Sequence, residues 1–304
     1  MNNLREDVIK EITERISNDY PDFVKAETMK VSKVNREVEE LVIVTRDRKA
    51  SPAISLDFIM EIAEDKGVKF AADCVYDMFK NAYEKSPSDE EIEFKKEKFF
   101  ACLVNKSENA ELLASVPHRE FLDMAIICRV FFNESKSGDI ASSIITNDLL
   151  TREIKLDENE LLDLAISNTR NLFPVTFRSM SEIISEMMGM PADMASEIAG
   201  PGMYVISNNK GLNGATNIIY TDVLEDIAKK IGEKFYIIPS SIHECIVIPI
   251  SDDVNESDED KIAEMIYEVN SSQVDESERL SNNLYMYISG ESIMIVKESD
   301  KALV

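Results

Sequence analysis

The chain has 304 residues, with 33 Lys and Arg against 58 Asp and Glu, which gives a formal net charge of -25. A hydrophobic fraction of 44% is enough to build packed cores, so a disordered chain is excluded. Direct binding to nucleic acid or to an anionic membrane needs Lys and Arg gathered on one face, so the acidic composition argues against both. Such a surface instead favours a basic protein partner.

The cellular setting is predicted from the start of the chain, its hydropathy and its cysteines. The first residues include acids where a signal peptide needs a basic region and an apolar core. The most apolar stretch, 121–132, contains two charged residues and is too short to cross a bilayer. The four cysteines lie far apart and form no CxxC pair, which predicts reduced thiols in a cytoplasmic protein with no cofactor. They are Cys74, Cys102, Cys128 and Cys245.

Residues 1–86 are predicted to form an N-terminal α+β lobe. Apolar residues recur every four positions from Leu4 to Ile16, which predicts an amphipathic helix that ends near Pro21. The following segments are rich in β-branched residues and then return to helical spacing. The expected strands are 24–34, 40–46 and 52–56, and the expected helices are 58–64 and 69–84.

Residues 87–200 are predicted to form a middle helical segment that also contains α/β structure. The stretch 189–202 is rich in Met, Pro and Gly, which indicates a boundary at its end. An adaptable apolar group is formed by Met190 in this stretch and by Met187 and Met188 just before it. Packing in a seam between domains is the favoured role of this group, and contact with a partner is the alternative. The expected elements are strands near 99–104 and within 121–132, a helix over 109–115, and helices from 157 and from 180.

Residues 201–304 are predicted to form an acidic C-terminal α+β domain. The expected order of strands and helices is β-α-β-β-α-β-β, which argues for a mainly antiparallel sheet. The last two strands form a hairpin that turns at Gly290 and Glu291. The predicted fold class is therefore α+β, with mixed, mainly antiparallel sheets and packed helices in two to three lobes. The strands are 203–207, 235–239, 244–250, 284–289 and 292–297, and the helices cover 218–231 and 262–269.

A turn at 239–244 gathers residues that can carry hydrolytic chemistry. Ser240 and Ser241 supply hydroxyls, His243 an imidazole and Glu244 a carboxylate. A hydrolase needs a nucleophile, a base within hydrogen-bond reach and an orienting acid. Neighbours on a tight turn rarely reach that geometry, and the chain has no GxSxG elbow. The alternative is that these side chains satisfy the backbone groups of the turn.

A second candidate is the polar loop 208–215, which lies between a predicted strand and a predicted helix. Free amide groups and the dipole of the helix can bind an anion at such a place. The candidate residues are Asn208, Gly211, Asn213 and Gly214. The loop lacks the endings of a P-loop and of a dinucleotide-binding turn. Its glycines are also explained if they only permit a positive φ angle.

No metal site is predicted. The segment 253–264 reproduces several ligand positions of an EF-hand loop, but Asp258 stands where the sharp turn needs Gly. The two histidines, His118 and His243, lie on separate segments, which is a thin basis for a metal centre. For His118 the sequence favours a place at the start of a helix or at the edge of a strand.

Six sequence blocks are similar to those of a known family. GMYVISNNKGLNGATNIIY, YIIPSSIHECIVIPI and EVNSSQVDESERLSNNLYMY resemble the signature blocks of an uncharacterised clostridial family, catalogued as domain of unknown function 5688. PAISLDFIM, VPHREFLDMAI and NTRNLFPVTFRSM resemble earlier blocks of that family, so the resemblance spans nearly the whole chain. It implies a bacterial cytoplasmic setting and brings no activity, cofactor or catalytic residue.

These observations favour a protein-binding or regulatory module. One alternative is a hydrolase-like enzyme that uses Ser240 or Ser241 with His243. The other is an acidic protein that mimics DNA and inhibits a DNA-binding protein, because residues 251–300 contain 14 acids and 3 bases. Whether the chain is an enzyme is left open by the sequence, as are its partner and its oligomeric state.

Overall fold

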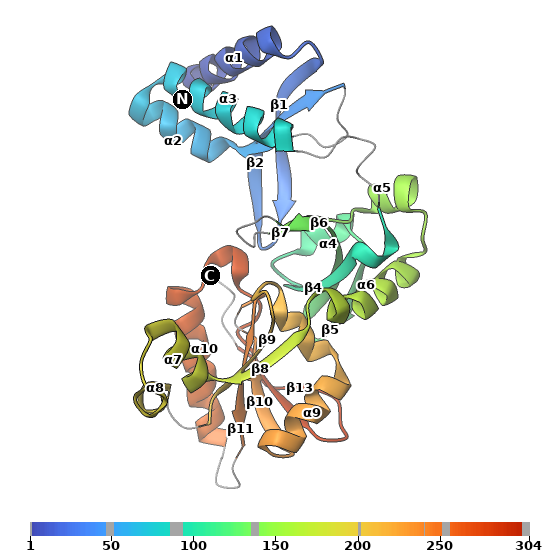
Figure 1. The fold of residues 1–304 in the computed structure, drawn as a ribbon, viewed down its shortest axis with the longest axis vertical. Coiled ribbons are helices and arrows are strands. Elements are labelled where there is room, and N and C mark those ends of the chain that lie inside the picture. The colour runs from blue at the N-terminus through green and yellow to red at the C-terminus, as the bar shows by residue number, and fades with distance from the viewer. Residues whose placement is uncertain are drawn as a thin grey trace. The chain divides into compact units, whose positions relative to one another are not determined.

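The computed structural model describes residues 2–46, 52–85, 94–134, 140–199, 202–239, 241–250 and 256–299 (Figure 1). Its contacts divide the chain into two compact units. The first unit comprises Met1–Lys33 and Glu37–Glu93, and the second comprises Val34–Arg36 and Phe94–Val304. Helices pack against antiparallel sheets, so the predicted α+β fold class is confirmed.

The first unit combines three helices with a three-stranded sheet of order β1-β2-β3. The predicted apolar stripe of the first helix is confirmed, because Val8, Ile12 and Ile16 are fully buried. They share a core with Leu41 of the sheet and Phe79 of the third helix. The elements are α1 (Asn2–Asp19), β1 (Phe23–Lys33), β2 (Arg36–Thr45), β3 (Ala53–Ser55), α2 (Leu56–Lys66) and α3 (Val68–Lys85).

The second unit begins with a four-stranded antiparallel sheet in which β6 pairs with β4, β5 and β7. Every residue of β4 is buried, because the two faces of this strand contact different apolar clusters. Phe99 and Leu103 belong to one cluster, whereas Phe100 and Val104 belong to the other. The elements are η1 (Lys96–Lys98), β4 (Phe99–Asn105), α4 (Ala110–Ser115), β5 (His118–Phe121), β6 (Met124–Glu134), β7 (Ile140–Ile144), α5 (Asn147–Leu149), η2 (Leu150–Ile154) and α6 (Glu158–Leu172).

The free edge of β4 is covered by threonine hydroxyls. Ala101 N donates to Thr169 Oγ1 over 2.8 Å, and Leu103 N donates to Thr216 Oγ1 over 3.2 Å. A buried amide without a partner costs free energy, and an uncovered edge can pair with another strand. The two hydroxyls therefore give these two amides hydrogen-bond partners and keep another strand from pairing with this edge.

The second sheet of this unit has six antiparallel strands in the order β13-β12-β10-β11-β9-β8. Helices α9 and α10 lie on opposite sides of it (Figure 1), because Phe235 packs with the residues of α9 and Tyr236 with those of α10. Among the described residues, no helix is long and apolar enough to cross a bilayer. The elements are β8 (Val175–Ser179), α7 (Met180–Met188), α8 (Ala192–Ala199), β9 (Tyr204–Asn208), η3 (Gly214–Ile219), α9 (Thr221–Ile231), β10 (Lys234–Ile238), β11 (Cys245–Pro249), α10 (Glu256–Gln273), η4 (Glu276–Glu278), β12 (Leu284–Ile288) and β13 (Met294–Lys297).

One apolar core joins the two sheets of the second unit. It contains Phe99 and Leu103 from the first sheet together with Phe235 and Tyr285 from the second. The segments predicted as 87–200 and 201–304 thus contribute to the same core, and β8 from the earlier segment pairs with β9 from the later one. The division into three domains at residues 86 and 200 stays a prediction.

The stretch expected as a boundary after Met188 contains a helix. Gly189 ends α7 in the left-handed conformation, with φ 62°. Pro191 then lies just before α8, where its missing amide costs nothing, and its carbonyl accepts from Ala195 N over 3.0 Å. Of the residues that suggested a boundary, Gly189 and Pro191 therefore mark the end of one helix and the start of the next, and residues 200 and 201 lie outside the described residues.

A partly buried polar cluster links the turn between β5 and β6 to the start of β12. The carboxylate of Asp123 accepts from Ser281 Oγ over 2.7 Å, from Asn283 Nδ2 over 3.0 Å and from the hydroxyl of Tyr285. Burial and the Asp123 carboxylate raise the pKa of Tyr285, so this phenol stays protonated and donates. The turn itself holds Leu122 at φ 58°, a conformation that a bulky residue rarely adopts.

Removal of the Tyr285 hydroxyl is expected to destabilise the second unit. A hydrogen bond to a charged group contributes about 1.5–3 kcal/mol, so Tyr285→Phe should lower the free energy of unfolding by that amount. Urea denaturation followed by circular dichroism measures it. The double variant Tyr285→Phe/Asp123→Asn should lose less than the sum of its single variants, and strict additivity would contradict the proposed bond.

Candidate functional site

The two loops selected from the sequence lie against each other. Asn213 N donates to His243 Nδ1 over 3.3 Å, and Ser207 Oγ donates to the carbonyl of His243 over 2.8 Å. Ala215 N donates to the carbonyl of Ile242 over 3.2 Å. The structure therefore brings the loop 208–215 and the turn 239–244 together, which their separation in sequence did not indicate.

Gly214 is required where these loops meet. A Cβ atom at this position would lie 2.3 Å from Ser207 Oγ and 2.5 Å from the carbonyl oxygen of His243. Gly211 has a different role, because its φ is 63° and a Cβ atom there would meet nothing within 4 Å. The positive-φ interpretation thus holds for Gly211, whereas Gly214 permits a close approach of backbone.

His243 has protein partners on both ring nitrogens. Its Nδ1 accepts from the Asn213 amide, so the neutral ring carries its proton on Nε2, which lies 3.2 Å from Glu278 Oε1. Glu278 belongs to η4 and was not selected from the sequence. It follows His243 by 35 positions in the chain, and no motif spacing connects the two residues. The contacts orient the imidazole and leave no ring nitrogen free.

The described part of the turn 239–244 satisfies its own backbone. Ser241 Oγ accepts from His243 N over 3.0 Å, and no described serine of this turn donates to the imidazole. The side chain of Glu244 is exposed, and Ser240 lies outside the described residues. The described residues of the turn have the arrangement expected of a structural turn, and among them no serine nucleophile is bonded to the imidazole.

The loop 208–215 likewise uses its amide groups within the protein. Asn208 Oδ1 accepts from Lys210 N over 2.9 Å and from Leu212 N over 3.4 Å. Gly211 N donates to the carbonyl of Asn208 over 3.1 Å, and the amide of Asn213 is bonded to His243. An anion at this loop would have to displace these bonds, so the geometry offers it no row of free donors at 210–213.

The remaining candidates concern metals. His118 lies on β5, which pairs with β6, and its Nδ1 is 3.1 Å from the carbonyl of Val116. The predicted location on a strand is therefore confirmed. Asp253 of the EF-hand-like segment lies outside the described residues. The part of the chain that the structure describes contains no group of three or more His, Cys, Asp or Glu side chains placed to hold a metal ion.

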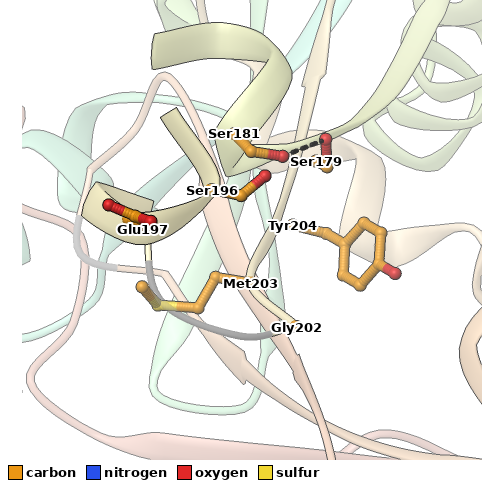
Figure 2. Close-up of a pocket in the computed structure, with 7 residues that line it drawn as sticks. All are labelled: Ser179, Ser181, Ser196, Glu197, Gly202, Met203 and Tyr204. Atoms are coloured by element: carbon orange, nitrogen blue, oxygen red, sulfur yellow. Dashed lines mark hydrogen bonds between the residues drawn. The ribbon is translucent and has the colours of Figure 1, made fainter. Parts of the chain in front are cut away.

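A cavity that the sequence did not indicate lies where α7 and α8 meet the edge of the six-stranded sheet (Figure 2). Its volume is about 480 Å³, which is within the range of ligand-binding clefts. Ser179 caps α7 and its Oγ lies 3.1 Å from Ser181 Oγ, so two hydroxyls are fixed at the wall. The lining residues are Ser179, Ser181, Ser196, Glu197, Gly202, Met203 and Tyr204.

An exposed apolar surface lies on the same two helices. Helix α7 contacts α8 and β8, and residues on the outer sides of both helices face solvent. We call this surface the methionine patch. It comprises Met187, Met188, Met194 and Ile198, whose exposed fractions are 81%, 63%, 53% and 58%.

The close contact at Gly214 predicts a strong effect of substitution. In Gly214→Ala the new methyl group forces backbone apart, and overpacking of this kind costs about 1–3 kcal/mol or more. Gly211→Ala is the matched control, because it adds only the left-handed strain of about 1–2 kcal/mol. Urea denaturation compares the two variants, and a Gly211→Ala protein less stable than Gly214→Ala would contradict the assignment.

The thiols predict a pattern of chemical reactivity. Burial raises the pKa of Cys102 to about 12, and it raises the pKa of Cys128 and Cys245 as well. Because the thiolate is the reactive form, these three thiols should resist a disulfide reagent in the native protein, whereas the partly exposed Cys74 should react. Absorbance of the released thiolate measures this, with Cys74→Ser as the control. Rapid labelling of the Cys74→Ser protein before unfolding would contradict the prediction.

Comparison with known proteins places the chain in a family without giving it an activity. Neither a search of curated proteins nor a search of solved structures found a match. The match to the family described as "Family of unknown function (DUF5688)" covers residues 5–289, which is almost the whole chain. The chain belongs to this family of unknown function.

Proposed function

We propose that this protein is a protein-binding module of the bacterial cytoplasm, which recognises a basic amphipathic segment of a partner through the methionine patch. The observation that carries the proposal is the exposure of Met187, Met188, Met194 and Ile198 on adjoining helices. Grouped apolar side chains on a surface are typical of interaction sites, whereas single exposed ones are common everywhere.

The chemistry of the patch suits a helical ligand. Methionine side chains are unbranched and polarizable, so they adapt to the apolar face of a bound helix. A helix that docks in this way presents apolar anchors three and four residues apart. The short helices α7 and α8 contact each other and are joined through Gly189 and Pro191, and both helices carry exposed apolar side chains.

The charge around the patch selects the partner. The sequences of α7 and α8 contain Glu182, Glu186, Asp193 and Glu197 and no Lys or Arg. One of these carboxylates, that of Glu186, is paired with Arg178 over 2.8 Å. The other acids and the net charge of -25 attract a basic segment and disfavour an acidic one. The hydrolase alternative gains no support from the turn 239–244, where both nitrogens of His243 are occupied.

The proposal is tested with Met187→Gln/Met188→Gln and the matched control Met265→Gln. Met265 is also exposed, at 46%, but lies on α10. Surface substitutions change stability by only about 0.5 kcal/mol, so all three proteins should fold alike. Proteins retained from a host lysate are then compared by quantitative mass spectrometry. We expect at least one partner that wild type and Met265→Gln retain and that the double variant loses about tenfold.

Two results would overturn the proposal. One is retention of the same proteins, at the same level, by wild type and by the patch variant. The other is a DNA-binding partner whose retention is abolished by salt and unaffected by the patch variant. That second result would favour the acidic DNA mimic, since counterion release makes such binding strongly dependent on salt.

A further inference from the structure

We infer that the cavity beside the methionine patch receives a lysine side chain of the bound partner segment. The inference rests on the proposed function, and it names the residue that anchors the partner. The cavity and the patch share a helix, because α8 contributes Ser196 and Glu197 to the cavity and Met194 and Ile198 to the patch. Eight residues of α-helix span about 12 Å, so the α8 residues of the cavity and of the patch lie within the length of one short segment.

The polar groups of the cavity are suited to a cation. Three serines, one tyrosine and one carboxylate line it, and none of its described lining residues is basic. The side chain of Glu197 makes no hydrogen bond or ion pair within the described residues. The hydroxyl of Ser196 donates to the carbonyl of Ala192 over 2.8 Å, which leaves its oxygen lone pairs free to accept. An anion would meet repulsion from the carboxylate, so a positively charged donor is the fitting ligand.

The arrangement of these acceptors favours an ammonium group over a guanidinium group. Figure 2 shows the hydroxyls of Ser179, Ser181 and Ser196 gathered at one side of the cavity, on three different elements. A lysine ammonium is a compact charge with three donors that can turn toward separate acceptors. Arginine instead matches a single planar acceptor with its rigid fork. Separate hydroxyl acceptors at one side of the cavity are therefore better satisfied by lysine.

The side chain of Met203 offers apolar surface for the stem of a lysine. Met203 and Tyr204 both line the cavity, and their side chains extend in opposite directions (Figure 2). The Tyr204 ring is held by stacking on Phe177, with the ring centroids 5.1 Å apart. Lysine buries its methylene groups along apolar surface while the charged end keeps polar contacts. The same aromatic ring attracts a nearby cation.

The first test does not require a partner. We expect n-butylammonium chloride, titrated to about 50 mM, to shift the NMR signal of the Met203 methyl group saturably, as weak binding of a five-atom ligand allows. The signal of Met187 should not move. The shift should be lost in Glu197→Gln and retained in Asp193→Asn, the matched control on the same helix. No shift with wild type, or an equal shift in Glu197→Gln, would overturn the lysine site and leave the patch proposal standing.

The second test asks whether a peptide lysine and Glu197 of the cavity are energetically coupled when the peptide binds. A fourteen-residue amphipathic peptide of Leu and Lys is labelled, and its binding is measured by fluorescence anisotropy at physiological salt. We expect one lysine whose replacement by Gln weakens binding to wild type about tenfold, with no further loss in Glu197→Gln. Replacement of that lysine by Arg should restore binding only in part.

The outcomes separate the two proposals. If the peptide binds and Met187→Gln/Met188→Gln weakens it, but no lysine couples to Glu197, the lysine site is wrong and the patch remains. If Asp193→Asn weakens binding as much as Glu197→Gln does, the effect is one of general charge and the lysine site is again wrong. Binding that is unchanged in the patch variant would contradict the proposed function, whatever the amine titration shows.

Discussion

The buried segment 280–282 is the constraint on which the second unit depends. Its residues lie in the interior outside any strand, so the usual ladder of backbone hydrogen bonds is missing there. Asparagine side chains replace that ladder. Asn105 Nδ2 donates to the carbonyl of Leu280 over 2.9 Å, and Asn270 Nδ2 donates to that of Ser281 over 3.0 Å. Loss of either amide would leave a buried carbonyl unsatisfied.

The same stretch of chain fixes the loops that meet at His243. Ser281 N donates to the carbonyl of Pro239 over 3.0 Å, and Ile242 N donates to that of Glu278 over 2.8 Å. The turn 239–244 is thereby held from both sides, and Glu278 is placed to orient the imidazole. A histidine beside serines suggested catalysis in the sequence. In the structure its ring accepts from the backbone amide of Asn213 and lies against the carboxylate of Glu278, so it links two loops.

Local patterns predicted the elements of this fold and could not predict its polar contacts. The stripe from Val8 to Ile16 was readable because burial of one helix face imposes a period on the sequence. Asp123 and Tyr285 are 162 positions apart, and no sequence pattern around either residue indicates that they form a hydrogen bond. Strand β8 was missed because it is short and partly exposed on both faces. The cavity was missed because its lining residues come from β8, α7, α8, β9 and the residues just before β9, and no sequence motif connects them.

Exposed apolar residues differ in whether other side chains of the same unit interact with them. In the first unit Phe70 is also exposed, but the ammonium of Lys66 lies 5.1 Å from the centre of its ring. Phe70 therefore already has a cation–π partner in the same unit. The methionine patch has no basic residue on α7 or α8, and the cavity beside it is lined by acceptors. Within the chain Arg178 supplies a cation only to Glu186, and the proposed basic amphipathic segment would supply the apolar and the electrostatic complement of this surface together.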